Sequence, residues 1–228
     1  MLSVVKGAPV EELIEKEKAK YKALEKIYEG DRKSWIDPNE SAFDGLDITD
    51  PRYTASTYGE LTPAGASQIV RKFKKHFMDP EAVFYDLGCG IGRFISHVSV
   101  LTNVKKSCGV ELCDKRYNKA LSLIESVGTF PASTPTMING NFLEQDYSDA
   151  TIVYIDNTMY NNDILEAVTK IVPPECIVVY KRGWLARGDP FFYVETTYNN
   201  SLKDEERSLI NQLTSKTCGW TYGGGHEF

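Results

Sequence analysis

Apolar residues in the first sixth of the chain recur at helical spacing and are separated by Glu and Lys residues of alternating sign. The stripe runs through residues 9–29 and predicts an amphipathic N-terminal helix with a solvated opposite face. Residues 30–56 are rich in Asp, Pro, Ser and Asn, which indicates a loop with short helical turns at most. We therefore expect residues 1–56 to form a small N-terminal helical appendage, either a lid or a packing strut.

From residue 57 onward, short apolar runs alternate with segments of helical period. Thr62 and Pro63 favour a helix start, because threonine can cap and proline fits the first helical position, and this helix should reach about Met78. The later predicted strands are 82–87, 107–111, 136–138, 151–156, 176–180, 191–197 and 217 onward, and the later helices are 93–101, 115–126, 163–171 and 203–213. Residues 57–228 should thus be a doubly wound α/β domain with a mainly parallel seven-stranded sheet and an antiparallel final hairpin.

Composition narrows the class of protein. The chain has 228 residues, 42% of them hydrophobic and 25% charged, which suits one globular domain with an appendage. A net charge of −6 argues against a stand-alone nucleic-acid binder and is compatible with a basic protein partner or a small molecule. We expect no membrane span, because no apolar run approaches the roughly 18 to 20 residues needed, and residues 1–10 carry no secretory signal.

Cysteine and histidine usage indicates no metal site. The five cysteines form no C-x-x-C pair, and an odd number without pairing is typical of reduced, buried thiols in a reducing compartment. The three histidines are scattered along the chain, so we expect ordinary core and surface roles for them.

A glycine-rich turn follows the first buried strand, in the order Tyr85-Asp86-Leu87-Gly88-Cys89-Gly90-Ile91-Gly92. Ligands of open α/β sheets bind at the carboxyl ends of the strands, where this turn is expected. Its spacing is G-x-G-x-G, whereas the dinucleotide fingerprint is G-x-G-x-x-G. The carboxylate of Asp86 would repel a pyrophosphate but can hold the ammonium of a methionine moiety.

Two further polar positions follow the next strands. Glu111 ends the second strand and can accept both ribose hydroxyls, while Asn141 and Phe142 follow the third strand, where they can reach and stack on adenine. An amino acid joined to a nucleoside matches these positions. The pattern predicts S-adenosylmethionine as cofactor, S-adenosylhomocysteine as product, and a class I methyltransferase type of fold.

Several segments together resemble the disruptor-of-telomeric-silencing (Dot-one-like) family. They are Tyr58-Gly59-Glu60-Leu61, residues 86–92, Gly109-Val110-Glu111, Gly140-Asn141-Phe142-Leu143, Asp156-Asn157 and Gly219-Trp220-Thr221. The resemblance covers residue 57 to the C-terminus, and the Tyr-Gly-Glu element is its most specific part. Members of this family are histone-lysine methyltransferases without a SET fold. The resemblance implies a core histone or nucleosome as substrate and a nuclear chromatin regulator, with the cytoplasm as the alternative location.

Roles are carried over from the family position by position. The resemblance implies a loop closing over the methionine end, formed by Tyr58, Glu60, Leu61 and Thr62. The amino acid and ribose would lie against Asp86, Gly88, Gly90, Gly92, Arg93 and Glu111, and the adenine against Asn141 and Phe142. Asp156, Asn157 and Tyr160 would lie beside the methyl group, line the lysine channel and act in catalysis, with Asp156 also touching the cofactor. The chain departs from the family with Asn141 in place of Asp, Asp156-Asn157 in place of Asn-Asn, and Leu61 in place of Thr.

Three functions remain open on the sequence alone. The first is histone-lysine methylation, the second is methylation of a small molecule or nucleic acid on the same fold, and the third is a cofactor-binding module without catalysis. Asp156 can serve either as proton acceptor or only to orient the amine. A basic stretch is either a weak DNA contact or a solvated helix face, and it comprises Arg71, Lys72, Lys74 and Lys75.

Overall fold

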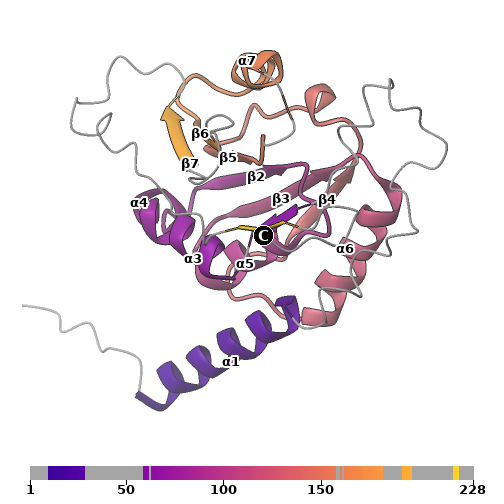
Figure 1. The fold of residues 1–228 in the computed structure, drawn as a ribbon. Coiled ribbons are helices and arrows are strands. Elements are labelled where there is room, and N and C mark those ends of the chain that lie inside the picture. The colour runs from indigo at the N-terminus through magenta and orange to yellow at the C-terminus, as the bar shows by residue number, and fades with distance from the viewer. Residues whose placement is uncertain are drawn as a thin grey trace, which may run out of the picture.

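The computed structural model describes residues 10–28, 59–61, 63–157, 160, 162–181, 192–196 and 218–220. Within these residues, six strands form one sheet in the order β4-β3-β2-β5-β6-β7 (Figure 1). The strands of this sheet are β2 (Val83–Leu87), β3 (Lys106–Glu111), β4 (Thr136–Asn139), β5 (Ile152–Ile155), β6 (Ile177–Lys181) and β7 (Phe192–Thr196). The helices are α1 (Val10–Tyr28), α3 (Pro63–Lys72), α4 (Lys74–Phe77), α5 (Arg93–Leu101), α6 (Asp114–Val127), the 3-10 turn η2 (Phe142–Glu144) and α7 (Asn162–Ile171).

The central strand is β2, which pairs in parallel with β3 on one side and β5 on the other. All five of its residues are buried, which explains the mostly apolar sequence that predicted it. The pairs β3–β4 and β5–β6 are also parallel, and β7 runs antiparallel to β6 at the edge. The mainly parallel α/β fold predicted from the sequence is therefore confirmed.

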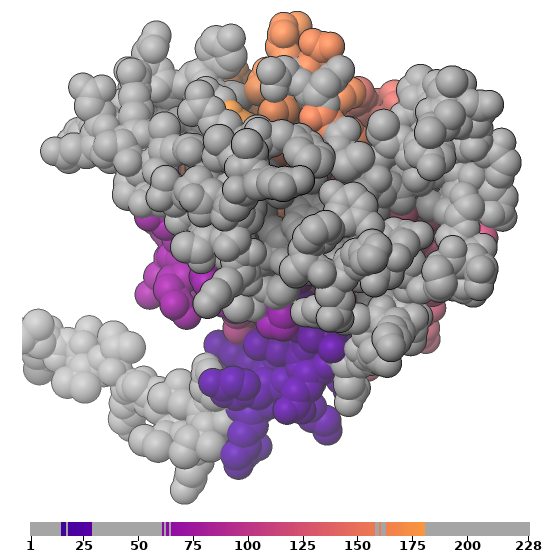
Figure 2. All heavy atoms as spheres, viewed as in Figure 1, coloured from indigo at the N-terminus to yellow at the C-terminus, as the bar shows by residue number. Residues whose placement is uncertain are grey.

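Helices cover both faces of the sheet. One hydrophobic cluster joins the sheet to α3, α4, α5 and α6, and a second joins its other face to α7 and the η2 turn. Figure 1 shows α7 on one side of the sheet and α3 and α5 on the other, with α1 a further layer beyond α5. The space-filling view shows the same arrangement, with α1 (indigo) and α7 (orange) at opposite ends of the visible face (Figure 2).

The N-terminal helix α1 is an integral part of this packing. Ala23 and Ile27 lie in the same cluster as α5, and Ile27 has no exposed surface. The Nζ of Lys26 donates to the carbonyl oxygen of Ser126 near the end of α6, at 2.7 Å. Of the two roles left open, the packing supports the strut.

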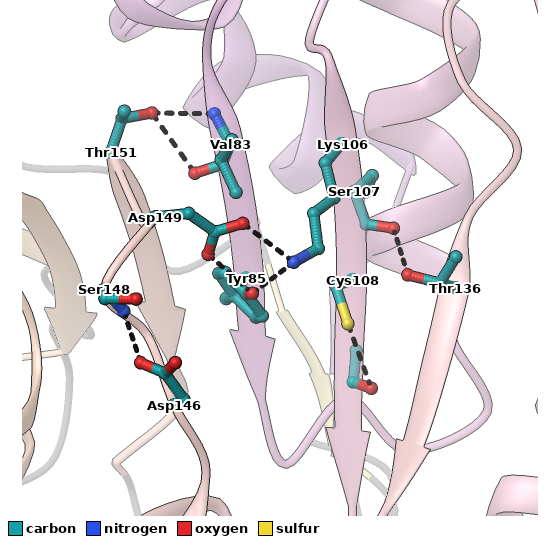
Figure 3. Close-up of polar contacts among 11 residues, drawn as sticks. Val83, Tyr85, Lys106, Ser107, Cys108, Thr136, Asp146, Ser148, Asp149 and Thr151 are labelled. Carbon is teal, nitrogen blue, oxygen red and sulfur yellow. Dashed lines mark hydrogen bonds and ion pairs between the residues drawn. The ribbon is translucent and has the colours of Figure 1, made fainter.

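A polar cluster joins the strands at the amino end of the sheet (Figure 3). Lys106 on β3 donates to the hydroxyl of Tyr85 on β2 and to Asp149 Oδ2 at 2.9 Å, and Tyr85 donates to Asp149 Oδ1 at 2.8 Å. Next to them, Thr151 Oγ1 accepts from the backbone N–H of Val83 at 2.9 Å. These contacts hold β2, β3 and the start of β5 in register away from the carboxyl end.

Two expectations differ from the structure. The predicted helix over 62–78 is two helices, α3 and α4, because Phe73 (φ −101°, ψ 30°) leaves helical geometry between them. In the described residues the main sheet has six strands, not seven. The predicted last strand, β8 (Cys218–Trp220), pairs antiparallel with β1 (Gly59–Leu61) in a separate two-stranded sheet. Local patterns identify a strand but not its partner, which tertiary contacts decide.

Other expected segments lie outside the described residues. They are the loop over 30–56, the helix over 203–213 and the parts of the final strand beyond β8. None of the described helices is long and apolar enough to cross a membrane.

His97 on α5 is buried and joins three helices. Its Nδ1 is 2.9 Å from the hydroxyl of Tyr28 on α1, and its Nε2 is 3.1 Å from the hydroxyl of Ser67 on α3. A neutral imidazole offers one donor and one acceptor, and a hydroxyl can take either role, so both nitrogens are satisfied. Burial lowers the pKa of His97 from 6.5 to about 4. The expected core role of this histidine is confirmed.

We predict that His97 makes the fold sensitive to acid. Because its pKa is lower in the folded chain than in the unfolded one, its contribution is complete above pH 6.5 and declines as the pH falls toward 4. That loss should be on the order of 3 kcal/mol. Denaturant unfolding between pH 7 and 4 should show a steeper loss for the wild type than for His97→Gln, and parallel curves would contradict the prediction.

Candidate functional site

Acidic residues meet at the carboxyl edge of the three central strands. The parallel register pairs Leu87 of β2 with Val110 of β3 and with Ile155 of β5. The next residues along the three chains are Gly88, Glu111 and Asp156, so they follow side by side at this edge. With Asp86 one position before Leu87, three carboxyl groups surround the start of the glycine-rich turn.

The backbone of Gly88 begins the turn in a conformation that favours glycine. Its φ of 79° lies in the left-handed region, where a Cβ would be strained. The N–H groups of Gly88 and Cys89 both donate to the carbonyl oxygen of Val110, at 2.8 and 3.1 Å, which fastens the turn to β3. A Cβ on Gly88 would lie 3.6 Å from the hydroxyl of Tyr160, so the tyrosine hydroxyl lies close above this backbone.

The turn fits against β3 because Gly109 has no side chain. A Cβ at Gly109 would overlap Cys89 Sγ and lie 2.9 Å from the Cβ of Cys89. Cys89 therefore occupies the space that any other residue at position 109 would fill, and its Sγ lies 3.7 Å from the Sδ of Met137. The glycine in Gly109-Val110-Glu111 thus serves packing of the turn.

Glu111 organises the turn as well as facing the site. Its carboxylate is 5% exposed and accepts from the backbone N–H of Gly90 at 2.8 Å and of Cys113 at 2.9 Å, one on each oxygen. Arg116 Nη1 on α6 lies 3.9 Å from Glu111 Oε1. A carboxylate has about four acceptor positions, so these bonds leave capacity for the hydroxyls of a ligand.

Asp86 lies in a setting that opposes its negative charge. Its side chain is 4% exposed, and its pKa is raised well above its usual value, first by burial and then by Asp156 and Glu111. Each of these influences would be offset by a cation placed between the carboxyl groups. The site is therefore complementary to a positively charged group.

Tyr160 and Phe142 form an aromatic wall beside the acids. Their ring centroids are 5.6 Å apart at an interplanar angle of 74°, an edge-to-face contact. Burial, and then the charges of Glu111 and Asp156, raise the pKa of Tyr160 to about 12. The phenol therefore keeps its proton at neutral pH, so it can donate a hydrogen bond but is not a base.

Asn141 supports the η2 turn that carries Phe142. Its Oδ1 accepts from the backbone N–H of Leu143 at 3.0 Å, and its Nδ2 donates to Glu144 at 2.8 Å. This capping arrangement fixes the amide next to the aromatic wall. The carbonyl oxygen of the amide retains a second lone pair for a donor such as an adenine amine.

The structure brings most of the predicted site residues together. At the carboxyl edge lie Asp86, Gly88, Gly90, Gly92, Glu111, Asn141, Phe142, Asp156, Asn157 and Tyr160. Asn157 is 7% exposed, and its backbone carbonyl oxygen accepts from the backbone N–H of Tyr160 at 3.1 Å.

Arg93 and Leu61 have contacts with other parts of the fold. The guanidinium of Arg93 lies over the ring of Tyr28, 5.5 Å from its centroid, and Leu61 is a buried member of the core. Tyr58 and Thr62 lie outside the described residues. Glu60 is the middle residue of β1, where its backbone pairs with Gly219.

Two residues near the acids were missed by the sequence reasoning. Arg116 approaches Glu111 as described above, and Leu112, directly after Glu111, is 38% exposed in spite of its large apolar side chain. Leu112 could have been identified from the sequence, because it directly follows the acid that ends the strand. The signal for Arg116 was its place in the first turn of the next helix, which begins at Asp114.

The basic stretch lies at the opposite edge of the sheet. The helix α4 ends beside the amino end of β2, where Phe77 O accepts from the backbone N–H of Asn103 at 3.2 Å. Arg71, Lys74 and Lys75 are exposed there. No group of His, Cys, Asp and Glu residues that could hold a metal ion occurs in the part of the chain that is described.

Two lysine methyltransferases are similar to this chain in sequence. A protein-lysine N-methyltransferase of Saccharolobus islandicus (strain REY15A) is 38% identical over 107 residues, which cover 45% of this chain and 65% of that protein. An H3 lysine-79-specific histone-lysine N-methyltransferase of Caenorhabditis elegans is 28% identical over 120 residues, covering 48% of this chain and 12% of that protein. The chain thus spans less than two thirds of the length of these relatives.

The chain was also compared with solved structures and with protein families. An RNA methyltransferase from Salinibacter ruber, solved with S-adenosyl-L-homocysteine, has a TM-score of 0.48 at 20% identity, covering 64% of this chain and 97% of that one. The sequence profile of the family described as histone methylation protein DOT1 matches residues 50–175, more than half of the chain. The chain therefore belongs to the DOT1 histone methylation family.

Proposed function

We propose that this chain transfers a methyl group from S-adenosylmethionine to a lysine side-chain amine of a nucleosomal core histone, as a chromatin enzyme of the nucleus. The observation that carries the proposal is the cluster of Asp86, Glu111 and Asp156 around the glycine-rich turn. Membership of the DOT1 family supports it, and so do the two lysine methyltransferases that the chain resembles.

The residues present fit the cofactor at both of its ends. The buried carboxyl of Asp86 would face the amino group, and Glu111, already held by Gly90 and Cys113, would accept from the ribose hydroxyls. The ring of Phe142, which packs edge-to-face with Tyr160, would stack on the base. Bound S-adenosylmethionine would supply the electrophilic methyl group.

The chain's own contribution to the reaction is alignment and proton handling. Methyl transfer to an amine is an in-line displacement, so positioning and exclusion of water supply most of the acceleration. The lysine must arrive as a neutral amine, and burial beside the ring of Tyr160 would disfavour its charged form. Asp156, next to Gly88 at the edge, would orient the amine or take its proton.

Contact with nucleosomal DNA is a secondary part of the proposal. Arg71, Lys72, Lys74 and Lys75 carry the charge for it, but α4 lies at the edge of the sheet opposite the acids. We therefore assign these residues at most a weak electrostatic role and place histone recognition at the carboxyl edge.

We predict that the purified chain labels a core histone when it is incubated with radioactive S-adenosylmethionine. Parallel reactions with nucleosomes, free core histones and RNA separate the substrate classes, and the double variant Asp86→Ala/Glu111→Ala should give background labelling. Labelling of RNA alone would exclude the histone substrate. Calorimetric binding of the cofactor without labelling of any acceptor would indicate a binding module without catalysis.

Glu111→Gln should weaken binding of S-adenosylhomocysteine by at least about tenfold, because hydrogen bonds to a charged acceptor are worth about 1.5–3 kcal/mol. Isothermal titration calorimetry measures the effect. Glu81→Gln, an exposed acid paired with Lys105 at the opposite edge, is the matched control and should bind as the wild type does. Equal affinity for Glu111→Gln and the control would remove Glu111 from the cofactor site.

Asp156→Asn should lower kcat on the order of a hundredfold at pH 7, since a general base typically contributes at least that factor. The kcat of the variant should increase with pH over a higher pH range than the kcat of the wild type, because the amine must then lose its proton to water. Profiles of kcat against pH test this, with Asp163→Asn on the exposed first turn of α7 as control. Full turnover with an unchanged profile would rule out the proton-acceptor role.

A further inference from the structure

The contacts of Tyr28 reach α5, the helix that follows the glycine-rich turn. Its hydroxyl bonds His97 on α5 at 2.9 Å, and its ring lies 5.6 Å from the imidazole in an edge-to-face contact. The same ring faces the guanidinium of Arg93, the first residue of α5 after the glycine-rich turn. One aromatic side chain of α1 thus contacts α5 at its first residue and one turn further on.

His97 extends this connection to α3. Its second nitrogen is bonded to Ser67 at 3.1 Å, and α3 begins at Pro63, two residues after Leu61 ends β1. Three residues of the segment predicted to close over the methionine end, Gly59–Leu61, form β1, which precedes this helix. The turn over 88–92 and β1 are therefore both followed by helices that His97 ties together.

The contacts among Tyr28, His97 and Arg93 restrict movement of the end of α1. His97 is 1% exposed and neutral, so its ring cannot turn to solvent without losing two hydrogen bonds. Arg93 is the charged group facing Tyr28, and Ile27, the neighbour of Tyr28, is fully buried. The end of α1 cannot shift without disturbing one of these contacts.

We propose that Tyr28 and His97 are positioning residues for the cofactor site, which set the distance between the glycine-rich turn and β1, the strand before α3. This inference rests on the proposed function and adds α1 to the cofactor-binding unit, although the family match begins at residue 50. Tyr28 touches neither cofactor nor substrate in this proposal. It acts through α5 and α3.

The test uses the full chain with Tyr28→Phe, Ser67→Ala and the double variant. Tyr28→Phe keeps the ring contacts with Arg93 and His97 and removes only the hydroxyl. Each single change should raise the Kd for S-adenosylhomocysteine and the KM for S-adenosylmethionine about three- to tenfold, the range for one net hydrogen bond. The kcat at saturating cofactor should stay within about twofold, because the reacting groups are untouched.

The double variant reports whether both hydroxyls act through the same histidine. Coupled residues give non-additive effects, so its Kd should rise by clearly less than the product of the two single changes. Tyr21→Phe is the matched control, since Tyr21 lies on the same helix and is 68% exposed. It should leave Kd, KM and Tm unchanged.

Three results would overturn the proposal in distinguishable ways. A lowered Tm with unchanged Kd in Tyr28→Phe and Ser67→Ala would make the contacts merely structural. Strictly multiplicative effects in the double variant would separate Tyr28 from Ser67. A wild-type chain that binds no S-adenosylhomocysteine would remove the proposed function itself, and this inference with it.

Discussion

Charge at the carboxyl edge is the constraint on which the site depends. Parallel pairing of β2 with β3 and β5 places Asp86, Glu111 and Asp156 around one turn, where burial and the two neighbouring acids raise the pKa of Asp86. Such a cluster is unfavourable by itself and is offset only by hydrogen bonds or by positive charge. Glu111 obtains the former from Gly90 and Cys113, whereas the surroundings of Asp86 favour a cationic ligand.

The same carboxylate both shapes the turn and faces the ligand. Because Glu111 accepts hydrogen bonds from the backbone of Gly90 in the turn and of Cys113 just after its own strand, its orientation is set before anything binds. Preorganised acceptors of this kind do not have to be ordered at the moment of binding. The close fit of Cys89 over Gly109 adds to this rigidity, since the turn rests on a strand with no side chain at that point.

Much of this architecture could be predicted from the sequence. The apolar runs, the glycine spacing and the strand-ending acids depend on local patterns, and the structure places Asp86, Glu111 and Asp156 where those patterns indicated. Pairing of β8 with β1 could not be predicted, because it depends on a contact distant in the sequence, and no pattern in the sequence marked the break at Phe73. The contact between Arg93 and Tyr28 could not be predicted either, because the two residues are 65 positions apart in the sequence and hydrophobic periodicity reports only local structure.

The hydrophobic core includes α1, which lies outside the region that the family shares. The family match begins at residue 50, yet Ala23 and Ile27 complete the hydrophobic cluster beneath α5. A shortened chain that keeps only the matched region would expose apolar side chains of α5 to water, at a free-energy penalty of about 25 cal/mol for each Å² uncovered. Relatives that lack such a helix must cover this face with another segment or with a different set of side chains.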